Sequence, residues 1–328
     1  MTGARRLAAA TSSDPTFVSR TQSPMATLRF RNRLGRMSTP PIRNARAASL
    51  PAKLSRTWLL VNAAKPQLFE PGQRSEADSV IFDMEAAVPD DGKDEARANV
   101  VEALSERDST TGEPNMTAWV RINGIKTPYW EDDLAALNGL AGLRGVMLPN
   151  TEAPSQVTWT AMKAGAGVPV LALIETANGV ENATDIANAP GTFRLALGTN
   201  DLRKDTGMSD DPLALAYVRS RLVIASRVGG LPGAIDGPSA PGASEERVRE
   251  DCEWTIKMGM AGKLTLTTSM APIINDALAP SEDEQRWARE LLKDAEHGAD
   301  ITDGSYLPRL ARAKKIVELA SSYGLWNA

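Results

Sequence analysis

The chain has almost no histidine or cysteine. Its 328 residues include one His, His297, and one Cys, Cys252. These counts exclude a His-rich zinc site, a disulfide framework, and a Ser-His-Asp or Cys-His pair near the predicted strands. Acid–base chemistry would therefore fall to carboxylates, Arg, Lys, water or a metal. We expect Cys252 to be a buried helix residue and His297 to lie at the end of a late helix.

Long hydrophobic runs are also absent, and charge is unevenly distributed. No apolar stretch approaches the roughly 18 to 20 residues needed to span a bilayer, so we expect no membrane partner. Residues 1–50 hold nine Arg and a single acid, Asp14, for a charge of +8, so the formal total of −4 leaves −12 on residues 51–328. A body this acidic argues against binding to nucleic acid.

The first 55 residues form a distinct segment. They are rich in Arg, Ser, Thr, Ala and Pro without an apolar period, which predicts a disordered N-terminal extension. The composition resembles a mitochondrial transit peptide, and it equally fits an overlong gene start with Met25 or Met37 as the true initiator. We expect a cytoplasmic protein, with the mitochondrial matrix as the alternative if the segment is a transit peptide.

From residue 56 onward, short apolar runs alternate with helical patterns. Continuous Val, Leu, Ile and Ala runs bounded by Pro or Gly are typical of strands buried in parallel sheets. The expected strands are 58–61, 79–82, 118–122, 145–148, 168–174, 193–197, 233–235 and 262–266, with helices such as 91–104 and 213–226 between them. Eight such units predict an α/β fold, a (β/α)8 TIM barrel over residues 56–280, followed by a small C-terminal helical lid over 281–328. A doubly wound open sheet is less favoured, because no Gly-rich dinucleotide loop follows the first strand.

Polar side chains follow the predicted strands where each one ends. In a barrel these positions face one cavity, and they are Asn62, Asp83, Glu85, Arg121, Asn123, Asn150, Glu175, Asp201, Asp236 and Thr267. Two converging carboxylates, Glu175 and Asp201, suit a hard divalent cation such as Mg²⁺ better than zinc. The alternative for Asp201 and Asp236 is a helix N-cap. The alternative for Arg121 is an ion pair with Asp83 or Glu85, and both readings can hold at once.

Several segments carry a resemblance to a known family. They are 56–61, 77–89 with Lys93 and Arg97, 120–123, 145–149, 173–176 and 198–202, in this order and spacing. The chain resembles the citrate lyase β subunit family of the HpcH/HpaI aldolase superfamily, which includes malyl-CoA and citramalyl-CoA lyases. The resemblance covers about residues 56–320, and Ile174-Glu175-Thr176 combined with Gly198-x-x-Asp201-Leu202 is its specific part.

The resemblance implies a Mg²⁺-dependent carbon–carbon lyase. Its substrate would be a 3-hydroxy-3-carboxyacyl thioester of the citryl-, malyl- or citramalyl-CoA type, cleaved through a thioester enolate to a 2-oxo acid and an acyl-CoA. By match to the family motifs, Glu175 and Asp201 would be the metal ligands, and Arg121 would hold the oxygen where enolate charge develops. A homo-oligomer, trimeric or hexameric, is also implied.

The same reading suggests supporting roles for four more residues. Asp83 and Glu85 would orient Arg121 and metal-bound water near the substrate. Lys65 and Arg74, near the exit of the first strand, are candidates for contacts with CoA phosphates, with solvated surface charges as the alternative.

The chain departs from the family pattern at several points. This chain has Asn62 where the family has Pro and Ala86 where the family has Asp. It has Asn200 in place of the family's Glu, and Leu266-Thr-Thr in place of the family's Ile-His-Pro. The lid, around 302–316, is shorter where a catalytic Asp is expected, which leaves Asp303 as the acid nearby. These departures keep three alternatives open: a thioesterase, a free hydroxy-acid aldolase, or a non-catalytic acyl-CoA-binding homologue.

Overall fold

The computed structural model describes residues 50–296 and 304–326. The predictions for residues 1–49, for His297 and for Asp303 lie outside these described residues. Where Cys252 is concerned, the prediction is confirmed, because this residue is fully buried on a helix.

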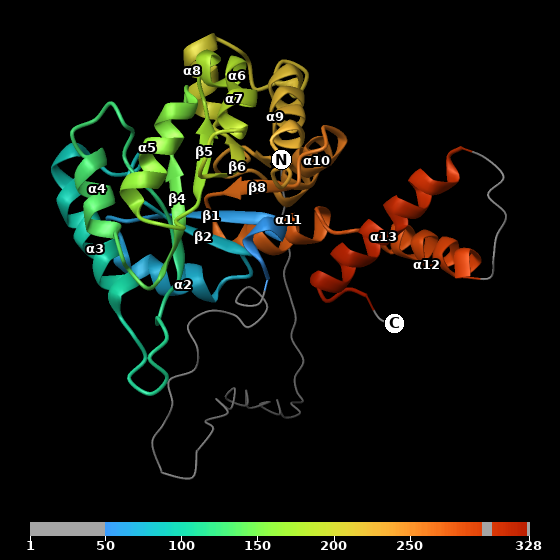
Figure 1. The fold of residues 1–328 in the computed structure, drawn as a ribbon, viewed down its shortest axis with the longest axis horizontal. Helices are drawn as coiled ribbons and strands as arrows, with labels where there is room; N and C mark the ends of the chain where they lie inside the picture. The colour runs from blue at the N-terminus through green and yellow to red at the C-terminus, as the bar shows by residue number, and fades with distance from the viewer. Residues whose placement is uncertain (1–49, 297–303, 327–328) are drawn as a thin grey trace, which may run out of the picture. The chain divides into compact units, whose positions relative to one another are not determined.

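Eight parallel strands close into a barrel in chain order (Figure 1), which confirms the predicted fold class. The strands are β1 Thr57–Asn62, β2 Ser79–Asp83, β3 Ala118–Arg121, β4 Leu143–Leu148, β5 Val170–Ile174, β6 Thr192–Leu197, β7 Ile235–Asp236 and β8 Gly262–Thr265. Strand β8 pairs with β1 and completes the closure. All carboxyl ends therefore lie at one end of the barrel.

Strand β7 begins two residues later than the sequence pattern predicts. Pro232 cannot donate a backbone hydrogen bond, so the chain there cannot join the ladder of a central strand. The carbonyl of Gly233 instead accepts a hydrogen bond from the Nε of Arg194. Regular pairing starts only at Ile235, opposite Ala196 and Gly262.

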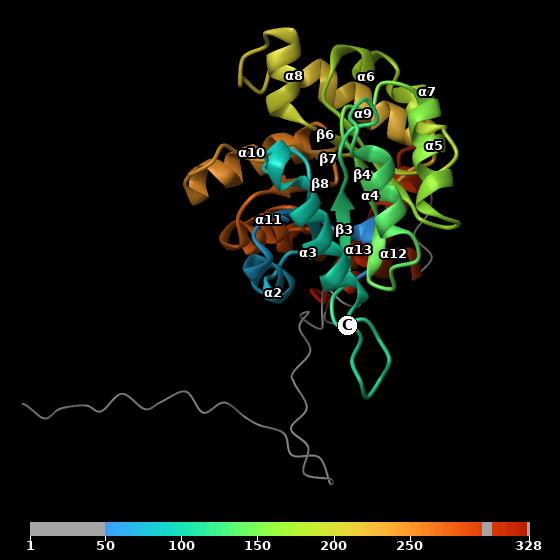
Figure 2. The same cartoon turned by 90° about the vertical axis from the view of Figure 1, so that its left-hand side faces the viewer.

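Helices surround the strands, and the predicted helices at 91–104 and 213–226 are confirmed as α3 and α9. The α-helices of the barrel are α2 Phe69–Arg74, α3 Lys93–Ser105, α4 Trp130–Leu137, α5 Pro154–Ala164, α6 Ala177–Glu181, α7 Ala183–Ala187, α8 Thr199–Thr206, α9 Ala216–Val228, α10 Glu245–Lys257 and α11 Ala271–Ala277. Short 3₁₀ turns occur at Ala52–Leu54, Pro66–Leu68, Asp90–Gly92 and Thr268–Met270. Figure 2 shows α3 and α4 covering the same side of the strands. Within the described residues, no helix combines the length and the apolar character that crossing a membrane requires.

The inside of the barrel is filled by one apolar cluster, with Trp58 and Trp119 in edge-to-face contact at 5.3 Å between ring centroids. Its buried members are Trp58, Ile81, Trp119, Met147, Leu171, Leu173, Ala196, Ile235 and Leu264. Because side chains alternate along a strand, residues two positions further along also face inward. Those residues include Asp83, Arg121 and Glu175, which the register therefore gathers at the carboxyl end.

Two C-terminal helices follow the barrel, α12 Glu282–Glu296 and α13 Tyr306–Ser322. They pack on each other through Ala288, Ala313 and Ile316. After α13, the Tyr323 hydroxyl donates to the carbonyl of Leu54 at 3.0 Å, and its ring lies 3.9 Å from the guanidinium carbon of Arg56. Helical structure is thus confirmed in the predicted lid segment, while its role as a lid stays a prediction.

Asp236 was expected in the shared cavity, and the structure corrects this. Because Ile235 belongs to the interior cluster, the next side chain points outward between α9 and α10. Asp236 accepts from the Nε of Arg219 at 3.0 Å and the Oγ1 of Thr255 at 2.7 Å, and the Nζ of Lys263 lies 3.9 Å away. Burial alone would raise the pKa of Asp236, but Lys263 and Arg219 hold it below its ordinary value.

We expect Asp236→Asn to lower the free energy of unfolding by about 3 to 5 kcal/mol at neutral pH, because two buried cations lose their shared anion. The folded pKa of Asp236 lies below the unfolded value of about 3.9, so its stabilisation is complete above that value. It is lost as the pH falls through the lower, folded pKa.

Urea unfolding of wild type and Asp236→Asn between about pH 2 and pH 8 measures the gap between their free energies of unfolding. The gap should narrow only at acidic pH. The control is Asp276→Asn, because Asp276 forms an exposed pair with Arg249 and should change stability by less than about 1 kcal/mol. A gap that is the same at every pH would contradict the assignment.

Candidate active site

Arg121 and Asp83 form a bidentate ion pair inside the mouth of the barrel. The register of β2 and β3 places the two residues directly opposite each other. The Nε and Nη2 of Arg121 each donate to one oxygen of Asp83, both at 2.6 Å. Burial would lower the pKa of Arg121, but Asp83 and Glu85 raise it above its ordinary value, so the guanidinium is a permanent cation.

Glu85 adds a second carboxylate to the same guanidinium. Its Oε2 lies 3.2 Å from the Nη1 of Arg121, and its backbone N–H donates to Asp83 Oδ1 at 3.0 Å. Burial raises the pKa of Glu85; Arg121 opposes this shift, and the carboxylates of Asp83 and Asp201 add to it. The structure thus brings Asp83, Glu85 and Arg121 together, which fits both the site role and the ion-pair alternative.

Glu175 is buried at the end of β5, and two neighbouring loops fit closely around it. Its Oε1 accepts the backbone N–H of Asn150 at 2.8 Å. Asn150 has a φ of 49°, a left-handed conformation that Asn tolerates better than most residues. On the other side, a Cβ added at Gly198 would overlap the Glu175 carboxylate, so a side chain there would push it out of place. The position of Glu175 therefore depends on the loops after β4 and β6.

The carboxylates of Glu175 and Asp201 follow the neighbouring strands β5 and β6, and the charge of Asp201 acts on Glu175. Burial raises the pKa of Glu175 to about 8; the N–H of Asn150 and Arg121 oppose this shift, while Glu85 and Asp201 add to it. Asp201 lies exposed in the first turn of α8. The N-cap of that helix is Gly198, so the N-cap alternative for Asp201 is wrong.

The structure separates Lys65 from Arg74. Lys65 follows β1 at the carboxyl ends of the strands and is exposed. Arg74 ends α2, where it pairs with Glu70, and its neighbour Gln73 donates to the carbonyl of Thr117, just before β3. Arg74 therefore belongs to the opposite end of the barrel, because α2 leads the chain back to the start of β2. This placement argues against the predicted contact of Arg74 with the same CoA phosphates as Lys65.

Asn123 also departs from the expected position in the shared cavity. Its backbone N–H and its Nδ2 both donate to Asp133 Oδ2 of α4, at 2.9 and 2.7 Å. Asp133 Oδ1 in turn accepts from the Nε of Arg97 on α3 at 2.8 Å. Asn123 thus links the loop after Arg121 to two helices.

Lys93 was not among the predicted site residues. Its Nζ is buried and donates to the carbonyls of Met84 and Glu85 at 2.9 and 2.7 Å. Burial lowers its pKa, and the carboxylates of Glu85 and Asp83 oppose this shift. The signal in the sequence is a Lys at the first position of a helix that otherwise begins with acids, where a cation is unfavourable.

The donor set of this site consists of carboxylate oxygens. Within residues 50–296 and 304–326, no group of three or more His, Cys, Asp or Glu side chains is arranged to hold a metal by itself. A Mg²⁺ ion needs fewer protein ligands than this, because it is usually held by one or two carboxylates together with water and substrate oxygens. With every group ionised, the four carboxylates (Asp83, Glu85, Glu175, Asp201) and two cations (Arg121, Lys93) leave a net charge of −2. The residues present therefore fit one divalent cation.

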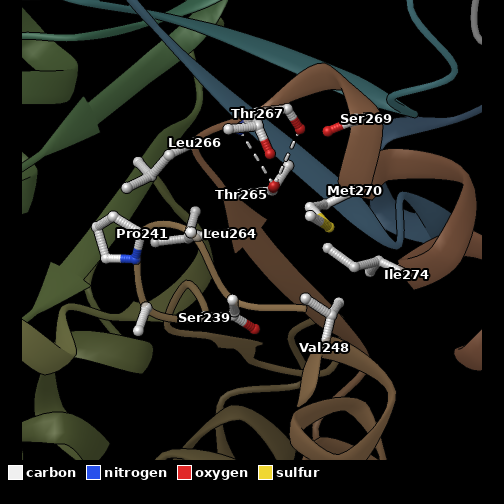
Figure 3. A pocket seen from close by; sticks show the side chains of 13 residues that line it. Ser239, Pro241, Val248, Leu264, Thr265, Leu266, Thr267, Ser269, Met270 and Ile274 are labelled. Atoms are coloured by element: carbon white, nitrogen blue, oxygen red, sulfur yellow. Dashed lines mark hydrogen bonds between the residues drawn. The ribbon is translucent and has the colours of Figure 1, made fainter. Parts of the chain in front are cut away.

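A separate pocket of about 100 Å³ lies beside the ends of β7 and β8 (Figure 3). Its wall includes Ser239, Pro241, Leu264 and Leu266, and none of its lining residues is charged. The Oγ1 of Thr265 donates to the carbonyl of Thr267 and accepts a hydrogen bond from the backbone N–H of Thr267, which closes the turn after β8. None of the predicted metal or arginine residues lines this pocket, so it is a distinct feature of the same region.

Most of the chain matches a known protein family. Residues 56–268 match the family described as HpcH/HpaI aldolase/citrate lyase, and residues 283–324 match the HpcH/HpaI aldolase C-terminal domain. The chain belongs to the HpcH/HpaI aldolase/citrate lyase family. It is therefore an enzyme of the lyase class by family, as the sequence motifs indicated.

Individual relatives are about 30% identical to this chain over the aligned residues. A citrate lyase subunit beta-like protein of Deinococcus radiodurans is 30% identical over 280 residues, covering 81% of this chain and 98% of the relative. A (3S)-malyl-CoA thioesterase of Cereibacter sphaeroides is 30% identical over 263 residues, 78% of this chain and 90% of the relative. An L-malyl-CoA/beta-methylmalyl-CoA lyase of Rhodobacter capsulatus is 29% identical over 276 residues, covering 74% of this chain and 84% of the relative.

Among solved structures, CitE of Mycobacterium tuberculosis in complex with magnesium, acetoacetate and coenzyme A is similar to this chain. The TM-score is 0.66 with 27% identity, covering 82% of this chain and 99% of that one.

We expect Gly198→Ala to lower lyase activity by about a hundredfold, because a displacement of about 1 Å at a catalytic group can have that effect. The overlap of the new Cβ with Glu175 is the physical cause. Steady-state kinetics together with a melting temperature check this. The control is Gly304→Ala, where an added Cβ meets nothing within 4 Å and activity should not change. Full activity in Gly198→Ala would contradict the placement of Glu175 in the site.

Proposed function

We propose that this protein is a Mg²⁺-dependent carbon–carbon lyase that cleaves a 3-hydroxy-3-carboxyacyl-CoA thioester to a 2-oxo acid and an acyl-CoA. The observation that carries the proposal is the arrangement of the barrel mouth, with the carboxylates of Glu175 and Asp201 on one side and Arg121, fixed by Asp83, on the other. A divalent cation and an arginine are the two electrophilic groups that such a cleavage needs.

Glu175 and Asp201 are the residues that would hold the cation. Burial of Glu175 beside Asp201 is unfavourable for two anions, and a bound cation would compensate both. When bound, Mg²⁺ acts as a Lewis acid toward the carboxylate and carbonyl oxygens of the oxo-acid half. The exposed position of Asp201 at the start of α8 leaves room for substrate on this side.

Arg121 would stabilise the enolate oxygen of the thioester half. A guanidinium has five N–H donors, and those directed at Asp83 and Glu85 leave at least two for a substrate oxygen. The bidentate grip of Asp83 fixes the plane of the guanidinium before substrate arrives. Such preorganised positive charge is effective where negative charge develops in the transition state.

The substrate class in this proposal is supported by the relatives. One is named a lyase of malyl-CoA and β-methylmalyl-CoA, and the CitE complex contains magnesium and coenzyme A. On this chain, exposed Lys65 beside the barrel mouth is the candidate for a CoA phosphate contact. We propose CoA as the thioester carrier on this basis.

A thioesterase is the second candidate, because one relative at 30% identity is named a (3S)-malyl-CoA thioesterase. The two activities differ in products. Carbon–carbon cleavage of malyl-CoA yields glyoxylate and acetyl-CoA, whereas thioester hydrolysis yields malate and a free CoA thiol. A thiol reagent and an oxo-acid assay on the same sample distinguish them.

We expect Glu175→Gln and Asp201→Asn each to reduce Mg²⁺-dependent release of oxo acid by at least about a hundredfold, because each removes one anionic ligand from a two-carboxylate site. The fold should persist, and circular dichroism checks this. Asp210→Asn is the control, since Asp210 forms a surface pair with Arg203. Unchanged metal dependence in either ligand variant would refute the assignment.

We expect Arg121→Lys to be nearly as inactive as Arg121→Ala. Lys presents a single point charge and cannot match the planar fork that grips Asp83 while it faces a carbonyl oxygen. Measured kcat for both variants checks this. Recovery of most turnover in the Lys variant would mean that Arg121 supplies only a generic positive charge.

A further inference from the structure

Lys93 combines two unfavourable placements. It is 6% exposed, and it occupies the first residue of α3, where the helix dipole disfavours a cation. The neighbouring first-turn residues, Asp94 and Glu95, have the charge that a helix start prefers. A buried ammonium at such a position needs compensating contacts.

The hydrogen bonds of the Lys93 ammonium lie on the segment that carries Glu85. Its Nζ donates to the carbonyls of Met84 and Glu85, directly after β2. The N–H of Met84 donates to the Arg121 carbonyl at 3.0 Å, and the Glu85 side chain reaches the Arg121 guanidinium. Lys93 therefore binds the main chain of the same two residues, Met84 and Glu85, that contact Arg121.

Lys93 also sets the charge of the site. Asp83 and Glu85 carry two negative charges against the single positive charge of Arg121, and the carboxylates of both lie close enough to act on Lys93. With Lys93 these four groups are neutral. Glu175 and Asp201 then remain as the uncompensated pair, and their charge matches one divalent cation.

We propose that Lys93 is a positioning residue that fixes the Met84–Glu85 main chain and places a positive charge behind the carboxylates of Asp83 and Glu85. This inference rests on the proposed metal-dependent function. Without Lys93 the site has one positive charge fewer, so a divalent cation binds more tightly. At the same time the Met84–Glu85 main chain loses its two hydrogen bonds to Lys93, so the Glu85 carboxylate shifts relative to Arg121 and turnover falls.

The test compares wild type, Lys93→Met, Lys93→Arg and the control Lys257→Met, an exposed helix Lys paired with Glu253. Calorimetry with Mn²⁺ alone gives metal affinity, and steady-state kinetics with malyl-CoA gives kcat and KM. Lys93→Met should bind Mn²⁺ about three- to tenfold more tightly, as expected for the loss of one nearby positive charge in a high effective dielectric. Its kcat should fall at least tenfold, whereas Lys257→Met should match wild type in both.

Lys93→Arg keeps the charge but moves the donors, so its Mn²⁺ affinity should stay within twofold of wild type while kcat falls. This variant carries the test if Lys93→Met does not fold. Weaker Mn²⁺ binding by Lys93→Met, tighter binding by Lys93→Arg, or unchanged kcat in both would overturn the inference. Failure of wild type to bind Mn²⁺ or to release oxo acid would instead overturn the proposed function, so the two failures are distinguishable.

Discussion

The bidentate pair between Arg121 and Asp83 is the interaction on which the rest of the site depends. A buried guanidinium is unfavourable without an anion, and the register of β2 and β3 supplies one directly opposite. Because both oxygens of Asp83 are used, the guanidinium has one orientation. The loop after β2 then adds Glu85 to a guanidinium that is already fixed. One pairing of adjacent strands thus determines where positive charge sits in the barrel mouth.

The opposite side of the mouth is built from close main-chain approaches. The left-handed Asn150 aims its N–H at Glu175, and Gly198 leaves room for the same carboxylate. The two loops follow β4 and β6, which pair with β5 on either side. Positioning by main chain suits a metal ligand, because a carboxylate held by a backbone N–H cannot swing away when the cation leaves.

The strand pattern could be predicted from the sequence because continuous apolar runs and their boundaries depend on local composition. The inward direction of Asp83, Arg121 and Glu175 follows from alternation once the strands are placed. The side to which Asp236 points does not follow, because β7 is only two residues long and offers no run of alternating residues from which its phase could be predicted. The barrel end on which Arg74 lies depends on where α2 stops, and helix ends are the least certain part of a sequence-based assignment.

The central claim is that Glu175 and Asp201 together hold one divalent cation opposite Arg121. The most direct measurement is anomalous diffraction from crystals of the wild-type protein grown with Mn²⁺ and a 2-oxo acid such as oxaloacetate. We predict one Mn²⁺ per chain, bound to a carboxylate oxygen of each residue and to oxygens of the oxo acid. An ion bound elsewhere, or no ion at this end of the barrel at saturating Mn²⁺, would contradict it.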